Sequence, residues 1–122
     1  MFLEQDDTQA TYLIQRYEPG KIWINQECYQ TSVVIWPHQM STWEPREFNE
    51  VKTEHFQVLF DSLPQILLLG TGCKLIIPPQ NLLLPLFEKG IGVEFMDSRA
   101  ACHTYTVLAS EKRNVAACIL II

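Results

Sequence analysis

The sequence predicts an α/β domain of three layers, in which helices cover both faces of a central mixed sheet. Between Gly90 and Leu108 a strand pattern runs directly into a helix pattern, which is half of a β-α-β unit. Two short runs, 65–69 and 115–122, are almost entirely apolar and suit strands that are covered on both faces. The first third of the chain alternates apolar and polar residues, as antiparallel strands do.

The N-terminal part is expected to be an antiparallel meander. Strands are predicted over 11–17, 21–25 and 28–36. Glu18-Pro19-Gly20 supplies a turn, because proline fixes φ and glycine accepts a positive φ. Residues 1–9 are expected to form a loose polar end.

Residues 37–50 are expected to form an irregular, polar segment with Trp43 in its middle. A tryptophan in such a loop packs back onto the core as an anchor, and a platform for a ligand is the alternative.

After a first helix, the C-terminal part alternates strands with helices in the order β-α-β-α-β, with one further short strand after its first strand. Helices are predicted over 54–63 with Thr53 as N-cap, from Pro78 to Gly90, and over 98–110 with Ser98 as N-cap. Pro85 predicts either a kink or a later start of the second helix. The predicted strands lie at 65–69, 74–77, 92–96 and 115–122. Parallel neighbours follow from this alternation, and the fully apolar last strand is expected at the centre of the sheet.

Length and composition limit the class of protein. The 122 residues fit one domain, and 48% of them are hydrophobic, so a real core is expected. The formal net charge of −5 makes nucleic acid a poor partner. No apolar run approaches the ~20 residues of a membrane span. The acidic start of the chain does not resemble a secretory signal, and we expect a cytoplasmic protein.

The four cysteines are far apart and form no Cys-x-x-Cys pair. This spacing argues against a zinc site and against a thioredoxin-type motif. They are expected to be free thiols in a reducing compartment. No nucleophile–base pair and no metal-ligand spacing stands out, so neither a catalytic residue nor a metal nor a cofactor is predicted.

Several stretches resemble one family in their order and spacing. They are Ile66–Gly72, the prolines at 78 and 79, Gly90–Met96, Ala100–Leu108 and Val115–Ala117. The chain resembles, from about Gly20 to its C-terminus, a family of small domains of unknown function in bacteria and archaea, whose mitochondrial member is an assembly factor for respiratory complex I. The resemblance implies a compact α/β fold with a mixed sheet, a protein partner, and no established catalytic activity. His103 and Thr106 depart from the Arg and Asn that the family commonly has there.

A candidate cleft lies where two loops are expected to leave the same, carboxyl edge of the sheet. Open α/β sheets bind ligands at that edge. The residues expected to line it are Gly70, Thr71, Gly72, Met96, Ser98, Cys102 and Tyr105. The alternative is that the glycines only make turns, and Asp97 would repel an anion at the helix start. Cys102 is expected to be a packed thiol, with a reactive thiol as the alternative.

Two hypotheses of function follow. The first is a non-catalytic binding or assembly domain, by resemblance in respiratory or membrane-complex assembly, with an exposed apolar patch for an unidentified protein partner. The second is a small enzyme or ligand-binding protein that uses the candidate cleft. A homo-oligomer is left open by the sequence.

Overall fold

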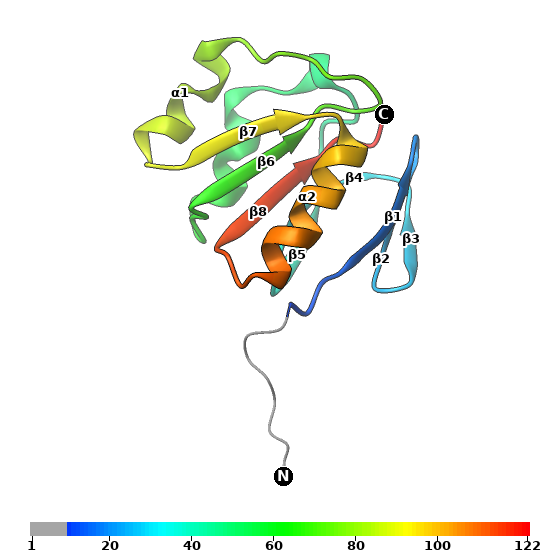
Figure 1. The fold of residues 1–122 in the computed structure, drawn as a ribbon. Coiled ribbons are helices and arrows are strands. Elements are labelled where there is room, and N and C mark those ends of the chain that lie inside the picture. The colour runs from blue at the N-terminus through cyan, green and yellow to red at the C-terminus, as the bar shows by residue number, and fades with distance from the viewer. Residues whose placement is uncertain (1–9) are drawn as a thin grey trace.

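The computed structural model describes residues 10–122 and contains two sheets (Figure 1). The small antiparallel sheet has the order β1-β2-β3, and the large sheet has the order β5-β4-β8-β6-β7. The strands are β1 (Ile14–Glu18), β2 (Lys21–Ile24), β3 (Glu27–Tyr29), β4 (Ser32–Trp36), β5 (Gln39–Trp43), β6 (Ile66–Gly70), β7 (Gly92–Met96) and β8 (Val115–Ile119). The helices are η1 (Phe48–Glu50), η2 (Thr53–Leu59), α1 (Gln80–Glu88) and α2 (Ser98–Ser110). The predicted loose end, 1–9, lies outside the described residues.

The large sheet is mixed, as predicted. β6 pairs in parallel with both β7 and β8, whereas β4 pairs antiparallel with β8 and β5. β8 is the middle strand, and its residues are all buried, which confirms the predicted place of the last strand.

The sheet has a hydrophobic layer on each face. Leu68 and Ala117 point to the layer that holds α2 and the small sheet, which includes Tyr105 and Ile22. Alternate residues of the same strands, such as Leu67, point to the layer that holds η2 and α1. Figure 1 shows α2 crossing one face of the sheet. These layers confirm the three-layer prediction.

The prediction of one strand over 28–36 is wrong. The chain leaves the small sheet after Tyr29 and enters the large sheet at Ser32. Gln30 and Thr31 between them are exposed, whereas every residue of β4 is buried. Only two residues separate β3, Glu-Cys-Tyr, from the β-branched run of β4, so the sequence pattern did not separate the two strands.

The prediction of an irregular segment over 37–50 is also wrong. β5 follows β4 through a two-residue turn at Pro37 and His38. Its sequence, Gln-Met-Ser-Thr-Trp, has little apolar alternation because the strand lies at an edge of the sheet. Trp43 does pack inward: it is 5% exposed, and its indole N–H donates to the carbonyl of His55 at 2.9 Å.

The helix expected over 54–63 is a 3₁₀ helix, η2, which ends at Leu59. Thr53 does not cap it. The helix starts after Lys52, whose N–H donates to Nδ1 of His55 at 2.9 Å. The 3₁₀ period of three residues aligns the buried pair Phe56 and Leu59. The short strand expected at 74–77 is irregular chain.

Helix α1 begins at Gln80, after Pro79 as N-cap, and contains Pro85. The start therefore falls later than Pro78. The predicted end is confirmed: Gly90 has a φ of 80° and follows the last turn. The N–H of Ile91 then donates to the carbonyl of Leu86 at 3.0 Å, which closes the helix.

Candidate functional site

The two loops of the predicted cleft lie at the same edge of the sheet. Gly70 pairs with Met96 at the carboxyl ends of the parallel strands β6 and β7. The N–H of Thr71 then donates to the carbonyl of Met96 at 2.8 Å. Gly70, Thr71, Gly72, Met96 and the start of α2 are therefore neighbours in space.

Ser98 ties these loops together. Its Oγ donates to the carbonyl of Leu120 at 2.6 Å and accepts from the N–H of Gly72 at 2.9 Å. Its own N–H donates to the carbonyl of Gly72 at 2.7 Å. Ser98 is fully buried. We call this group, Gly70, Gly72, Ser98 and the carbonyl of Leu120, the clasp.

Ser98 is not the N-cap of α2, contrary to the prediction. Asp97 is the cap: its Oδ1 accepts from the N–H of Ala100 at 2.8 Å. The carbonyl of Asp97 accepts from Ala101 at 2.9 Å. Asp97 has the extended backbone of a cap residue, which leaves the Ser98 side chain free to turn inward. The first turn of α2 thus already has a carboxylate on its free N–H groups.

The glycines of the clasp are required by close packing. A Cβ on Gly70 would lie 2.9 Å from Oγ of Ser98 and 3.1 Å from Cβ of Ala101. Gly72 has a φ of 102°, and a Cβ there would run into the carbonyl of Ile122. This geometry explains the Gly-x-Gly pattern by turn and packing.

Cys102 and Tyr105 lie behind the clasp, on the buried side of α2. Cys102 is 5% exposed, and burial raises the pKa of its thiol to about 12, although Arg99 opposes the shift. Burial also raises the pKa of Tyr105, whose hydroxyl donates to the carbonyl of Tyr12 at 3.3 Å. Both side chains pack as neutral groups. His103, on the next position of the helix, is exposed.

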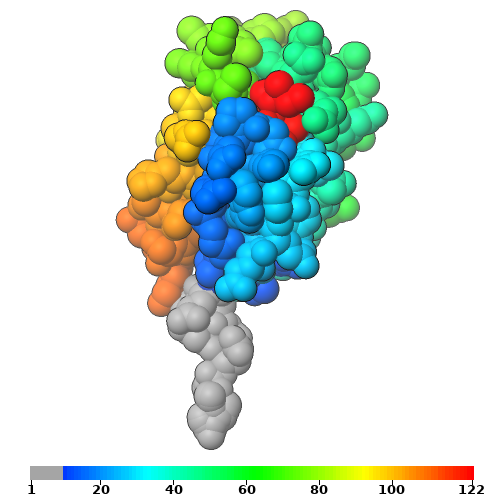
Figure 2. Space-filling model, turned by 90° about the vertical axis from the view of Figure 1, so that its right-hand side faces the viewer, coloured from blue at the N-terminus to red at the C-terminus, as the bar shows by residue number. Residues whose placement is uncertain are grey.

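A hollow of about 300 Å³ adjoins this edge. Its lining is Glu47, Phe48, Asn49, Thr71, Cys73, Lys74, Ile76 and Ile122. Among the seven predicted site residues, only Thr71 lines it. The Thr71 hydroxyl donates to the carbonyl of Lys74 at 2.6 Å and accepts from the N–H of Ile76 at 3.1 Å. Figure 2 shows the C-terminal residues, in red, at the surface between the blue β1–β2 hairpin and green segments. That the predicted residues bind a ligand stays a prediction.

Sequence reasoning missed the other residues of this hollow. Cys73 could have been predicted, because it directly follows Gly72 in the loop that leaves a buried strand, and the structure shows it exposed. The 47–49 segment gave none, because it reaches the edge through a tertiary contact: the N–H of Ile122 donates to the carbonyl of Arg46 at 3.1 Å.

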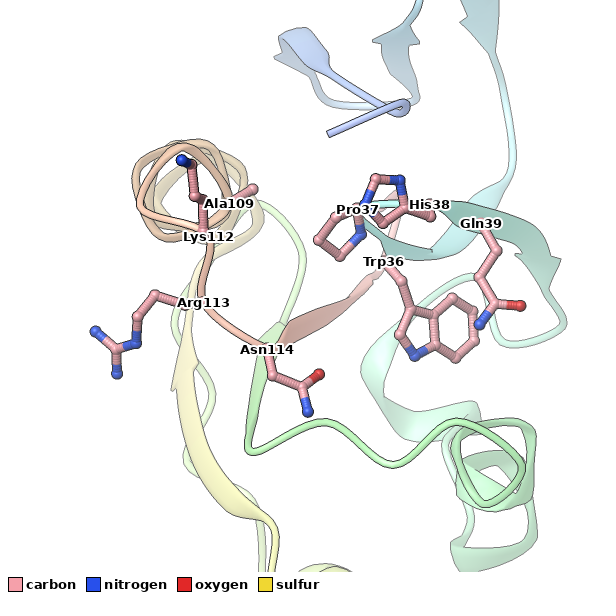
Figure 3. A pocket seen from close by; sticks show the side chains of 8 residues that line it. All are labelled: Trp36, Pro37, His38, Gln39, Ala109, Lys112, Arg113 and Asn114. Atoms are coloured by element: carbon pink, nitrogen blue, oxygen red, sulfur yellow. The ribbon is translucent and has the colours of Figure 1, made fainter. Parts of the chain in front are cut away.

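A second hollow, of about 490 Å³, lies at the other end of the sheet (Figure 3). It is lined by Trp36, Pro37, His38, Gln39, Ala109, Lys112, Arg113 and Asn114. Arg113 extends away from Trp36, whereas the Asn114 amide lies on the Trp36 side (Figure 3). Lys112 has a φ of 64° and lies two residues beyond the end of α2, where the N–H of Arg113 donates to the carbonyl of Leu108 at 3.1 Å. The main chain of Lys112 and Arg113 therefore closes the C-terminal end of α2.

Exposed apolar side chains occur on α1 and in the chain that leads into it. Leu75 is 58% exposed and Ile77 is 73% exposed, in the irregular chain that leads into the helix. Leu84 and Phe87 on α1 are also exposed. We call Leu75, Ile76, Ile77, Leu84 and Phe87 the apolar surface.

The described part of the chain has neither a cluster of metal ligands nor a membrane-spanning helix. Within residues 10–122, no cluster of three or more His, Cys, Asp or Glu side chains is placed to hold a metal ion. In the same range no helix is both long and apolar enough to cross a bilayer.

Comparison with known proteins places these features in context. The family described as "Protein of unknown function (DUF498/DUF598)" matches residues 14–120. The chain is 30% identical over 123 residues to the "13 kDa major membrane protein" of Francisella tularensis subsp. holarctica, with 99% of each protein covered. It is 30% identical to the Danio rerio protein named "NADH dehydrogenase [ubiquinone] 1 alpha subcomplex assembly factor 3", with 95% of this chain and 68% of that protein covered. The Homo sapiens protein of the same name is 25% identical, and the match spans 65% of its length.

Solved structures share the fold. A crystal structure from Bordetella parapertussis superposes with a TM-score of 0.87 at 27% identity and covers 96% of this chain and 100% of that chain. An NMR structure from Xanthomonas campestris gives a TM-score of 0.82 at 30% identity and covers 99% of this chain and 92% of that one.

Proposed function

The chain belongs to the DUF498 family of proteins of unknown function, and from that membership we propose that it is a non-catalytic, protein-binding domain with an assembly-factor-like role. The support is twofold. Relatives that match nearly all of this chain carry the name of an assembly factor for NADH dehydrogenase. The chain also exposes five large apolar side chains between Leu75 and Phe87, which suits a binding domain.

The apolar surface is the observation that carries the proposal. Five large apolar side chains are exposed within 13 positions of one another, from Leu75 to Phe87. Apolar patches of this kind mark protein interaction sites in soluble domains, because water-exposed apolar area is costly unless a partner covers it. The segment 75–77 does not build the core, since its side chains are exposed.

The geometry supports a partner that lies along α1. Helix α1 packs on β7 and η2 through its buried residues Leu82, Leu83 and Leu86. Leu84 and Phe87 therefore point away from that packing and remain accessible. A partner helix or strand could cover them together with Ile77 without disturbing the core.

The test is in-cell cross-linking of the tagged chain, followed by quantitative mass spectrometry. Ile77→Asp and Phe87→Asp should lose the cross-linked partner, because a charge in an apolar interface is buried without a counter-charge. Val107→Asp is the matched control: Val107 is 43% exposed on α2, outside the apolar surface. Partner recovery that is equal for all three variants would refute the proposal.

We include a cytoplasmic location and a membrane-complex client in the proposal. Cys28 and Cys73 are exposed free thiols, which suits a reducing compartment. The name of the Francisella relative places that protein at a membrane. Fractionation should therefore find this chain in the cytosol and, in part, on membranes that salt or carbonate strips. Protein that only detergent extracts would contradict the location.

A second candidate function is ligand binding at the carboxyl edge, supported by the 300 Å³ hollow beside Thr71. Small anions and amides titrated into ¹⁵N-labelled protein would test it. If a ligand binds, the NMR signals of the Thr71 and Ile76 amides should shift in a saturable way. Both residues line the hollow, and the N–H of Ile76 donates to the Thr71 hydroxyl. Shifts confined to other parts of the chain would contradict it.

A further inference from the structure

Strand β5 has a free edge with unused main-chain groups. In the described part of the chain, Gln39–Trp43 pairs only with β4 and ends the order of the large sheet. The two-residue turn makes Trp36 and Gln39 the closing hydrogen-bonded pair. Because hydrogen-bonded and non-hydrogen-bonded pairs alternate, the N–H and C=O groups of Met40 and Thr42 face outward. Within residues 10–122 no hydrogen bond reaches them from outside the sheet.

This edge has none of the usual features that prevent strand pairing. It contains no charged residue, no proline and no register shift, whereas edges that must stay unpaired are guarded by such features. The opposite edge differs. β7 carries Glu94 at its centre, and α1 contacts it.

The β5 sequence is complementary to itself. In an antiparallel pair with a two-fold axis at Ser41, Met40 lies opposite Thr42 of the second copy, and Gln39 lies opposite Trp43. No like charges meet. Directly beyond the strand, His38 lies opposite Glu44 of the second copy, so that an imidazole faces a carboxylate. Both side chains are exposed, and that of Glu44 is 87% accessible although it also contacts His55.

A two-fold pair of β7 strands is less favourable. Centred on Glu94, it would place two carboxylates opposite each other, which destabilises a cross-strand pair. Self-pairing therefore favours β5 over β7.

We propose that two copies of this chain form a homodimer through β5, by antiparallel pairing about Ser41 that continues the large sheet across the two-fold axis. Met40 and Thr42 of each copy would exchange main-chain hydrogen bonds with Thr42 and Met40 of the other. The proposal is independent of the proposed function. Leu84 and Phe87 of the apolar surface lie on α1, which contacts β7 at the opposite edge, so the dimer would present two copies of them.

The expected dimer is weak. One strand pair of five residues gives an interface at the small end of the range for proteins. Sedimentation velocity should therefore show a mass that rises with protein concentration, and Thr42→Pro should abolish this rise, because proline removes an outward N–H.

A disulfide trap tests the register. Residue 41 falls in a non-hydrogen-bonded pair, where Cα atoms lie about 4.5 Å apart, within disulfide range. The native chain would first lose its exposed thiols through Cys28→Ser and Cys73→Ser. Ser41→Cys should then give roughly tenfold more disulfide-linked dimer than Gln39→Cys, since Gln39 faces Trp43 and not itself.

Equal cross-linking of Ser41→Cys and Gln39→Cys would overturn the proposed register. A monomeric mass up to millimolar concentration would overturn the dimer itself. If the chain is monomeric and β5 instead cross-links to another protein, the edge accepts a foreign strand and the homodimer is wrong.

Discussion

Gly72 of the clasp and residues 75–77 of the apolar surface lie on the loop between β6 and α1 and have opposite character. Gly72 and Ser98 are buried, and each uses polar groups in hydrogen bonds to the other. Three positions beyond Gly72, Leu75 begins a run of exposed apolar side chains. On this loop the hydrogen-bonded main chain of Gly72 is buried, whereas the apolar side chains of residues 75–77 are exposed.

This contrast suggests that the two groups of residues have different roles, one in stability and the other in binding. A buried serine is stable only where its hydroxyl is paired, and that of Ser98 is paired twice. Exposed apolar residues contribute little to the fold, so a partner is the physical reason for them that we propose. Substitutions in the clasp should therefore change the free energy of unfolding, and substitutions in 75–77 should change binding.

The largest effect is expected at Gly72. Gly72→Ala combines a positive φ with a collision at the carbonyl of Ile122 and should lower the free energy of unfolding by about 3 kcal/mol. Gly20→Ala is the control, because Gly20 also has a positive φ, 89°, but open space around it. That control should cost about 1 kcal/mol. Urea unfolding measures both, and equal losses would show that the clasp is not tightly packed.

Ser98→Ala should lower the free energy of unfolding by about 2 kcal/mol, since it leaves the N–H of Gly72 and the carbonyl of Leu120 buried without their partner. Ser110→Ala removes an exposed hydroxyl that bonds only to Val107 at the end of the same helix. Thermal unfolding should distinguish the two variants. A Ser98→Ala protein as stable as Ser110→Ala would mean that the clasp contributes nothing to the fold.

Cys102→Ala should cost about 1 kcal/mol, from one small buried group. The thiol has its pKa raised from 9.0 to about 12. The contribution of the buried thiol to the free energy of unfolding is therefore complete below pH 9. It is lost as the pH rises toward 12, because in that range the thiol ionises in the unfolded chain but stays protonated in the folded one. Unfolding at several alkaline pH values should show a shallower loss in Cys102→Ala than in the native chain.

Alkylation of the native chain gives a second readout of Cys102. Iodoacetamide should modify Cys28 and Cys73 first, since these are exposed and Cys102 and Cys118 are buried. Preferential labelling of Cys102 at neutral pH would instead favour a reactive thiol.

The smallest effect on stability is expected in the apolar surface. Leu75→Ser and Ile77→Ser should each change the free energy of unfolding by less than about 0.5 kcal/mol, because both side chains are more exposed than buried. A loss of 2 kcal/mol or more in either variant would show that the segment packs in solution and is not a free surface.

The parts of the fold that sequence predicted are those with a strong local signal. β8 is apolar throughout, and α2 has a helical stripe next to a strand, so both were placed correctly. β5 failed because an edge strand does not need apolar alternation. The prediction of an α-helix at η2 failed because apolar residues three and four positions apart fit either helix type over a short span. Only the packing of Phe56 and Leu59 selects the 3₁₀ form.

The candidate site shows the same limit. The sequence could indicate that Gly72 and Ser98 share an edge, because strand order determines it. It could not indicate that Ser98 turns inward and Asp97 takes the cap, since both residues are good caps. The exposure of Leu75–Ile77 was equally hidden, because an apolar run of three reads as a buried strand.

Amide hydrogen exchange of the native chain tests the contrast between clasp and apolar surface most directly. The amides of Gly72 and Ser98 donate to buried acceptors and should exchange only through near-global unfolding. Within the described chain the amides of Leu75 and Ile77 have no acceptor, so they should exchange at nearly the rate of an unfolded peptide. Rapid exchange at Gly72 and Ser98, or protection at Leu75 and Ile77 in the free protein, would contradict the account.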